Sequence, residues 1–184
     1  MSFRVSHLEA ARLMPWANGK GRTRELARCE ADGALLYRIS IADVVEAGAF
    51  SGLPGIDRHL VLLGGAGFEL EINGVVRAVR PLVPVAFSGD DAVSAVHISG
   101  PSQDFNVMVA RGKARAEVTV ATRGFDDALP EIGFYYVAGG VFAFELPGAR
   151  ELRAGSLIEA NVEPGSKITI AGQGSLICVR ISIL

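Results

Sequence analysis

The chain has 184 residues, of which 49% are hydrophobic and 21% are charged, and its formal net charge is −2. This composition is typical of a globular protein that buries about 70% of its unfolded surface, and the charge balance argues against nucleic acid or an anionic membrane as a partner. No apolar run approaches the ~20 residues of a membrane helix, and the first residues lack the apolar centre of a signal peptide. We therefore expect a cytoplasmic protein with one domain or two closely packed halves.

The predicted elements are almost all strands, after a short helical turn at HLEAARL (7–13). LLYRISIADV (35–44) alternates between an apolar face and a polar face. FELEINGVVRAV (68–79) alternates again, and Asn73-Gly74 within it favours the positive φ angles of a tight hairpin turn. A second helical turn is expected at FDDAL (125–129). The other predicted strands are 59–65, 92–99, 104–110, 116–121, 134–146, 156–162, 166–171 and 175–184.

Short strands with regularly spaced turn signals between them predict an antiparallel barrel or sandwich. An internal similarity points to two related halves, because FELEINGVVRAVRPLVPVAF resembles FAFELPGARELRAGSLIEA at a constant offset that places Phe68 over Phe142. Alternating strands imitate one another easily, so chance is the alternative. We expect two stacked β-barrel halves, residues 1–112 and 113–184. SGPSQDFN in the first half is matched by the apolar AGQGSLIC, so the chemistry is expected in the first half.

The segment PWANGKGRTRE (15–25) is unusually polar for a position before the first strand. Asn18-Gly19 favours a turn, and an extended GRTRE places Arg22 and Arg24 on one face and Thr23 and Glu25 on the other. Two guanidinium groups on one face suit a carboxylate ligand. The alternative is that an arginine pairs with a structural acid, while Trp16 only closes the end of a barrel.

Two strands carry further polar pairs. Arg38 and Ser40 share one face of YRIS, and Asp104 and Asn106 share one face of the DFN strand. An acid and an amide at alternate positions suit a ligand that offers an N–H and a carbonyl group. A solvated strand face, or side chains that close a turn, is the alternative.

Metal and nucleophile motifs are scarce. His7, His59 and His97 do not show the HxH spacing of a metal-binding barrel, and we find no CxxC pair, GxGxxG or Ser-His-Asp order. Asp57-Arg58 is interpreted as a local ion pair. The candidate pocket is therefore rich in arginine, amide and acid, which suits binding better than bond-making.

Five blocks of the sequence resemble the HutD/Ves family: PWANGKGRTRE, YRISIADV, GAFSGLPGIDRHLVLLGGAGFEL, VAFSGDD and SGPSQDFNVMVARG, in this order. The family pattern runs approximately PWxNGxGxTRE, WRxSxAxV, GPFSxFPGxDR, FxG and GxxxDFNVMxRRG. The resemblance is dense over residues 15–112 and weak elsewhere. It implies a cupin-like fold with two halves, a bicupin, in a bacterial protein of histidine utilisation. It also implies binding of a pathway intermediate such as N-formylglutamate, and it brings no established enzyme activity.

The motif residues carried over from the resemblance are Trp16, Asn18, Gly19, Thr23, Arg24, Glu25, Arg38, Ser40, Phe50, Ser51, Pro54, Gly55, Asp57, Arg58, Asp104, Phe105, Asn106 and Met108. The chain departs from the pattern at Lys20, Tyr37, Ala49, Leu53, Ser88 and Ala110. Ser88 stands for an acid and Ala110 for an arginine. These two changes leave the family assignment intact but are expected to shift the preferred ligand.

We predict a small-molecule binding protein with a regulatory role in histidine catabolism, without a catalytic residue, cofactor or metal. Its ligand is expected to be an acylated acidic amino acid, with Arg24 pointing inward to hold a carboxylate. The predicted ligand-binding residues are Trp16, Asn18, Arg24, Glu25, Arg38, Ser40, Arg58, Asp104 and Asn106.

Two other functions stay open. One is a metal-free, isomerase-like cupin enzyme that acts on a small carboxylate with Asp104 or Glu25 as its base. A carboxylate buried in the pocket, away from any arginine, would favour it because burial raises the pKa of an acid. The other is a structural or partner-binding role. A homodimer is compatible with each.

Overall fold

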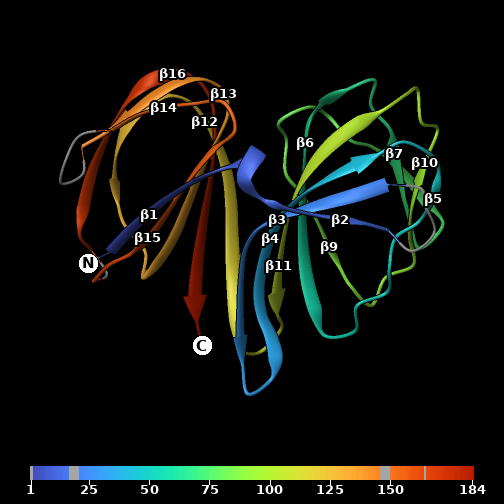
Figure 1. Ribbon diagram of the computed structural model, residues 1–184. Coiled ribbons are helices and arrows are strands. Elements are labelled where there is room, and N and C mark those ends of the chain that lie inside the picture. Colours follow the sequence, from blue (N-terminus) through green and yellow to red (C-terminus); the bar gives the residue numbers. More distant parts are fainter. Residues whose placement is uncertain (1, 17–20, 146–149, 164) are drawn as a thin grey trace. The chain divides into compact units, whose positions relative to one another are not determined.

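The computed structural model describes residues 2–16, 21–145, 150–163 and 165–184. These residues form sixteen strands and one short 3-10 helix, Leu8–Ala10 (Figure 1), so the predicted all-β class is confirmed. The helical turn expected near residue 125 is wrong, because those residues belong to the long strand β12 (Ala114–Ala128). The described part of the chain contains no helix long and apolar enough to cross a bilayer.

The chain divides into two compact units. The first unit contains Arg12–Arg115, and the second contains the residues up to Ala11 together with Ala116–Ile183. The sequence-based boundary, after residue 112, lies close to this division. The first residues join the second unit because β1 (Ser2–His7) pairs with β15 (Ser156–Asn161) along its whole length.

The first unit contains two antiparallel sheets. One has the order β2-β3-β4-β11-β6-β9 and the other has the order β5-β10-β7-β8. The strands are β2 Arg12–Pro15, β3 Gly21–Ala31, β4 Ala34–Val44, β5 Gly48–Ala49, β6 Ile56–Gly65, β7 Glu69–Ile72, β8 Val75–Ala78, β9 Val85–Ser88, β10 Val93–Val96 and β11 Ser102–Ala110. The predicted turn between β7 and β8 is confirmed, with φ angles of 50° at Asn73 and 80° at Gly74.

An apolar core stabilises the first unit. Alternation along β6 and β7 places Leu60, Leu62 and Leu70 in this core, all at most 2% exposed, because successive side chains of a strand point to opposite faces. The other core members are Val44, Phe68, Ile72, Val79, Phe87, Val93 and Ala95. This core fixes the strands that carry the polar positions described below.

The second unit consists of one sheet, in the order β1-β15-β13-β16-β12, with β14 paired beside β13. The strands not yet given are β13 Ile132–Phe144, β14 Arg150–Arg153 and β16 Lys167–Ile183. Its succession β12-β16-β13-β15 has the same connectivity as β4-β11-β6-β9 of the first unit, since in both the fourth strand along the chain lies between the first and the second. The described strands of neither unit close into a complete ring.

Candidate functional site

A cavity of about 480 Å³ lies within the first unit. Strands β2, β3, β4, β6 and β11 and the segment 49–53 contribute side chains to it. The lining residues are Met14, Pro15, Trp16, Thr23, Arg38, Ser40, Ala42, Ala49, Phe50, Ser51, Leu53, Arg58, Asp104, Asn106 and Met108. This volume lies within the range of small-molecule sites.

The polar floor of the cavity follows from strand register. In the antiparallel pairing of β11 with β4, Asn106 lies opposite Ser40, and Met108 lies opposite Arg38. On the other side of β11, Met108 lies opposite Arg58 of β6. Because directly opposite residues share a face of the sheet, these side chains all reach the cavity, whereas their apolar neighbours point away.

Asp104 is the most deeply buried polar residue of the floor, with 1% of its surface exposed. The Asn106 amide donates Nδ2–H to Oδ1 of Asp104, while Oδ2 has no hydrogen-bond partner among the described residues. Burial raises the pKa of the Asp104 carboxyl to about 7, against the Asn106 hydrogen bond and the charge of Arg58, which both lower it. This carboxyl therefore titrates near neutral pH.

Arg58 supplies a buried positive charge, with 7% of its surface exposed. Its guanidinium carbon lies 4.8 Å from the Phe87 ring centre and 5.3 Å from that of Phe50, and its Nη1 donates to the Ser51 carbonyl at 3.4 Å. Burial lowers the pKa of Arg58 to about 10, so it remains protonated at neutral pH. Its Nε is a buried donor without a partner in the described structure.

Arg38 has a carboxylate beside it. Its Nε forms an ion pair with Oε2 of Glu25 at 3.0 Å, although it makes no hydrogen bond with a described residue. Oε2 of Glu25 is also 3.7 Å from Nη1 of Arg28. By contrast, Arg58 makes no ion pair with a described carboxylate.

Four buried side-chain atoms have no hydrogen-bond partner in the described part of the chain: Nε of Arg38, Nε of Arg58, Oδ2 of Asp104 and Oδ1 of Asn106. All four belong to residues that line the cavity. A buried polar atom without a partner costs about 1 to 3 kcal/mol, so native proteins seldom keep several together without a reason. Two donors and two acceptors in one cavity match a polar ligand.

The structure brings six of the nine predicted ligand-binding residues to this cavity: Trp16, Arg38, Ser40, Arg58, Asp104 and Asn106. Trp16 donates Nε1–H to the Thr23 hydroxyl at 2.8 Å, which fixes its ring at the cavity wall. Asn18 lies outside the described residues. Glu25 does not line the cavity but contacts it through Arg38.

Arg24 does not point into the cavity, contrary to the sequence-based expectation. Thr23, which was expected to face away, lies opposite Ala42 and lines the cavity, so Arg24 falls on the other face of the sheet. There Nη1 of Arg24 is 3.2 Å from Oδ2 of Asp43, which also accepts a hydrogen bond from Nε of Arg22 at 2.8 Å. Arg24 is therefore placed as an ion-pair partner.

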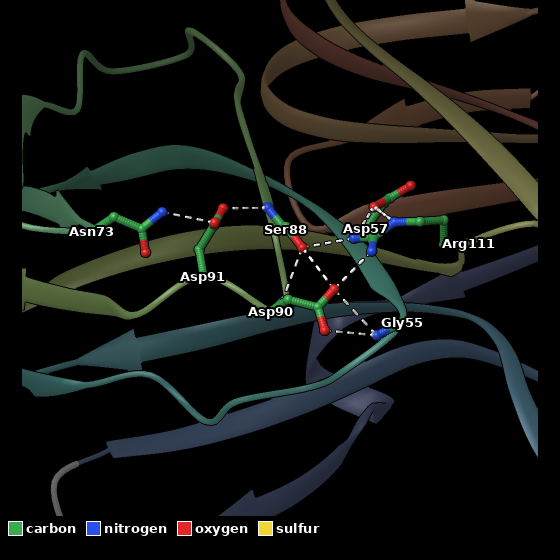
Figure 2. A network of polar contacts seen from close by, with 7 residues as sticks. All are labelled: Gly55, Asp57, Asn73, Ser88, Asp90, Asp91 and Arg111. Carbon is green, nitrogen blue, oxygen red and sulfur yellow. Dashed lines mark hydrogen bonds and ion pairs between the residues drawn. The ribbon is translucent and has the colours of Figure 1, made fainter.

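The predicted Asp57-Arg58 pair is also corrected, because adjacent strand residues point to opposite faces. Asp57 accepts a hydrogen bond from Nε of Arg111 at 2.8 Å (Figure 2). Arg111 also donates to Asp90 at 2.7 Å and to the Ser88 hydroxyl at 2.6 Å. Ser88, where the family pattern has an acid, belongs to this network and not to the cavity lining.

Sequence reasoning missed the aromatic cage of Arg58 and this supporting network. The Arg111 network holds the segment that ends at Gly55, since Asp90 accepts from the Gly55 N–H at 3.3 Å and the Gly89 carbonyl accepts from the Leu53 N–H at 2.9 Å. The same segment contributes Phe50 and Ser51 to the cavity. The tetrapeptide AFSG, which occurs in both the third and the fourth block and supplies both rings of the cage, was the available signal.

Among the described residues, no group of three or more His, Cys, Asp or Glu side chains is arranged to hold a metal ion. The cavity's chemistry is instead that of two guanidinium groups, an amide, hydroxyl groups and one carboxyl that titrates near neutral pH. This set can bind an anion and an N–H group, and it can accept or donate one proton.

The HutD family model matches residues 8–178 of the chain. An "uncharacterized 21.2 kDa protein in hutC 3'region" of Pseudomonas putida is 39% identical over 110 residues, which cover 57% of this chain and only 57% of that relative. Protein Ves of Citrobacter koseri is 36% identical over 131 residues, 69% of this chain and 68% of the relative.

Solved structures agree with this assignment. The structure of HutD from Pseudomonas fluorescens SBW25, described as a formate condition, has a TM-score of 0.91 at 26% identity and covers 100% of both chains. A cupin 2 conserved barrel domain protein from Leptotrichia buccalis has a TM-score of 0.55 at 11% identity over 88% of this chain and 89% of that one, which shows a cupin-like fold alone. The resemblance to HutD/Ves is therefore confirmed, and the chain belongs to the HutD family.

Proposed function

We propose that the cavity of the first unit binds a small carboxylate, and that this binding serves a regulatory role in histidine utilisation. The ligand class is an acylated acidic amino acid such as N-formylglutamate. The observation that carries the proposal is Arg58, a buried guanidinium with no described ion-pair partner and an unpaired Nε that lines the cavity. A ligand carboxylate supplies the missing charge and hydrogen bond.

Burying the charge of Arg58 costs free energy that a bound anion can offset. Desolvation of a guanidinium disfavours its charged form, and the two phenylalanine rings around Arg58 offset this only in part. A site that bears this cost before its ligand arrives is preorganised, because the charge and its cage need no rearrangement on binding.

The unpaired oxygen of Asn106 gives a second reason for this ligand class. The Asn106 amide already donates Nδ2–H to Asp104, so its Oδ1 is directed to accept. An amide N–H of an acylated amino acid fits this acceptor, while Arg38 and Ser40 lie on the same floor for a further carboxylate or carbonyl. The ligand therefore combines an N–H group with at least one carboxylate.

The biological setting comes from the relatives. The chain belongs to the HutD family, and one relative is described by its place in the hutC 3' region of Pseudomonas putida. Both support a place in bacterial histidine utilisation, and we infer a cytoplasmic location for the protein. The family resemblance implies that N-formylglutamate is an intermediate of this pathway. The regulatory role and the ligand remain the proposal.

Calorimetric titration of the purified protein with N-formyl-L-glutamate, glutamate and urocanate tests the proposal. We expect saturable heat with at least one of them at up to millimolar concentration. Arg58→Met removes the buried charge and should cost about 2 to 5 kcal/mol of binding, or roughly 30-fold to several thousandfold in affinity. The matched control is Arg24→Met, which removes a guanidinium outside the cavity lining and should leave the affinity within about twofold.

An absence of heat for all three compounds would remove the proposed function. Equal affinities for Arg58→Met and the unaltered protein would leave binding in place but would move it away from this cavity. Loss of affinity in Arg24→Met alone would restore the role first expected for that arginine.

A second function is favoured by one observation: Asp104 is a cavity carboxyl, buried, with no described ion-pair partner and a pKa raised by burial to about 7. Such a group suits a metal-free isomerase-like reaction on a small carboxylate. Asp104 would take a proton from carbon beside a carbonyl group, Arg58 would stabilise the enolate, and Asp104 would return the proton. Exchange of that C–H for deuterium, followed by NMR in D₂O, would support this enzyme, and unexchanged ligand after days would exclude it.

We also infer that the two units are two cupin-like halves of one bicupin. The shared strand connectivity of β4-β11-β6-β9 and β12-β16-β13-β15 supports this inference. So does the constant offset in the sequence, which places Phe68 over Phe142 and Leu70 over Phe144, since these core residues are each at most 4% exposed.

A further inference from the structure

One carboxylate oxygen of Asp104, Oδ2, is available to a ligand in the cavity. Oδ1 is held by the N–H of Asn106, whereas Oδ2 has no partner among the described residues, and the side chain is almost completely shielded from solvent. A ligand that enters the cavity can therefore form its contact with Oδ2. Whether that oxygen accepts or donates depends on whether Asp104 carries a proton.

The charged groups around Asp104 come from three strands. Arg58 of β6 and Arg38 of β4 line the cavity, and Glu25 of β3 lies beside Arg38. Asp43 of β4 is held by Arg22, Arg24 and Gln103, and its charge raises the pKa of Asp104 slightly. None of the described cations forms an ion pair with Asp104, so its negative charge is balanced only from a distance.

A ligand carboxylate bound by Arg58 would share the buried cavity with Asp104. Two carboxylates in one desolvated site repel each other, so one of them holds a proton, as in paired catalytic aspartates. A protonated Asp104 then donates Oδ2–H to a ligand oxygen, which converts the repulsion into a charge-assisted hydrogen bond. The ligand's own carboxylates, with ordinary pKa values near 4, are the weaker bases once Arg58 holds one of them.

We propose that the cavity takes up one proton together with its anionic ligand, and that Asp104 carries this proton as a hydrogen-bond donor to the ligand. The proposal rests on the ligand binding proposed above and adds the protonation state in which binding occurs. The pKa of Asp104, which burial raises to about 7, supports it, because the free protein can supply either form near neutral pH.

The affinity for the anionic ligand is expected to fall as the pH rises. Below pH 7 the free protein already holds the proton, so binding takes up little. Above pH 7 the free carboxyl is ionised and must be protonated on binding, so uptake approaches one proton, and affinity falls about tenfold for each further pH unit. The amide and carboxylates of N-formylglutamate do not titrate between pH 6 and pH 8.

Calorimetry of N-formyl-L-glutamate binding in two buffers of different ionisation enthalpy measures the uptake directly. At pH 8, in HEPES and in Tris, the difference in heat should correspond to about 0.9 proton per ligand; at pH 6, in MES and in Bis-Tris, it should correspond to about 0.1. The affinity should be about tenfold weaker at pH 8 than at pH 6.

Two variants assign the proton. Asp104→Asn keeps the shape and presents an N–H in place of the acid's O–H, so we expect binding with equal heats in both buffers and one affinity from pH 6 to pH 8. Glu25→Gln removes the other carboxylate close to the cavity, and the proton uptake at pH 8 should persist in it. Circular dichroism of both variants confirms that they fold.

These titrations separate a failure of the proposed function from a failure of this inference. No heat from the unaltered protein would remove the proposed function and this inference with it. Clear binding with equal heats at pH 8 would leave the function and overturn the inference. Uptake that persists in Asp104→Asn, or vanishes in Glu25→Gln, would assign the proton to another group and overturn the inference as well.

Discussion

The two units share the connectivity of four strands but differ in the side chains that those strands bury. In the first unit, the strand β11 brings Asp104 and Asn106 to a cavity. In the second unit, the corresponding strand β16 carries Cys178, which belongs to an apolar core. One connectivity therefore carries a cavity lined by polar groups in the first unit and apolar packing in the second.

The second unit satisfies its buried polar groups internally. The Tyr135 hydroxyl donates to Asp127 at 2.6 Å, and Arg180 donates to the other carboxylate oxygen. Tyr135 packs its ring against Phe144, with ring centres 5.7 Å apart. The four unpaired buried atoms of the described chain all lie in the first unit. The proposed binding site therefore coincides with the buried polar groups that lack internal partners among the described residues.

The largest expected effect is on the stability of the second unit. Asp127→Ala leaves the buried Tyr135 hydroxyl and the partly exposed Arg180 guanidinium without their shared carboxylate, which should cost about 3 kcal/mol. Urea unfolding should show this loss, while ligand affinity at the first unit's cavity should stay unchanged. An unaltered free energy of unfolding would contradict this contrast between the units, since the second unit would then not depend on its internal polar pairs.

The next effect is a loss of stability with rising pH in the first unit. An unfolded aspartate loses its proton near its ordinary pKa, whereas native Asp104 keeps it to about pH 7. The native state thus holds more protons in between, and the free energy of unfolding should fall by roughly 2 to 3 kcal/mol from pH 5 to pH 8 and then level off. Asp43 has a lowered pKa, so its stabilising contribution is already fully present at pH 5. Burial also lowers the pKa of His59, so the contribution of His59 to stability rises with pH within this window and offsets part of the fall.

Asp104→Asn is the control for this pH dependence. It should flatten the fall between pH 5 and pH 8 in urea unfolding, because the amide does not titrate. A slope that persists in the variant would show that another group causes it, and the buried-acid description of Asp104 would be contradicted.

The smallest effect is expected at Arg24, which lies outside the cavity lining. Arg24→Met removes one partly exposed ion pair with Asp43, and such pairs contribute about 0.2 to 1 kcal/mol. Arg22 still pairs with Asp43. A melting temperature that drops by many degrees would show that the ion pairs of Arg22 and Arg24 with Asp43 stabilise β3 more than its packing on the cavity side does.

Alternation made much of the site predictable from sequence. Arg38 and Ser40, and likewise Asp104 and Asn106, occupy alternate positions on strands, so each pair had to share a face. The turn at Asn73-Gly74 was predictable for a similarly local reason. These features depend only on neighbouring residues.

The errors come from features that depend on distant parts of the chain. Which face of β3 meets the cavity is set by its register with β4, where Thr23 lies opposite Ala42, and no local pattern gives this register. Phe87 is far from Arg58 along the chain, yet β9 places it opposite Arg58 in the sheet. Such contacts require the strand order, which sequence periodicity does not contain.

The most direct test of ligand binding in the cavity is a crystal structure of the protein with N-formyl-L-glutamate, grown at pH 6 with millimolar ligand. We expect a ligand carboxylate within hydrogen-bond distance of Nε of Arg58 and a ligand atom within reach of Asp104 Oδ2 or Asn106 Oδ1. Ligand bound at Arg22 and Arg24 on the opposite face of the sheet, or a cavity without ligand beside binding measured in solution, would contradict it.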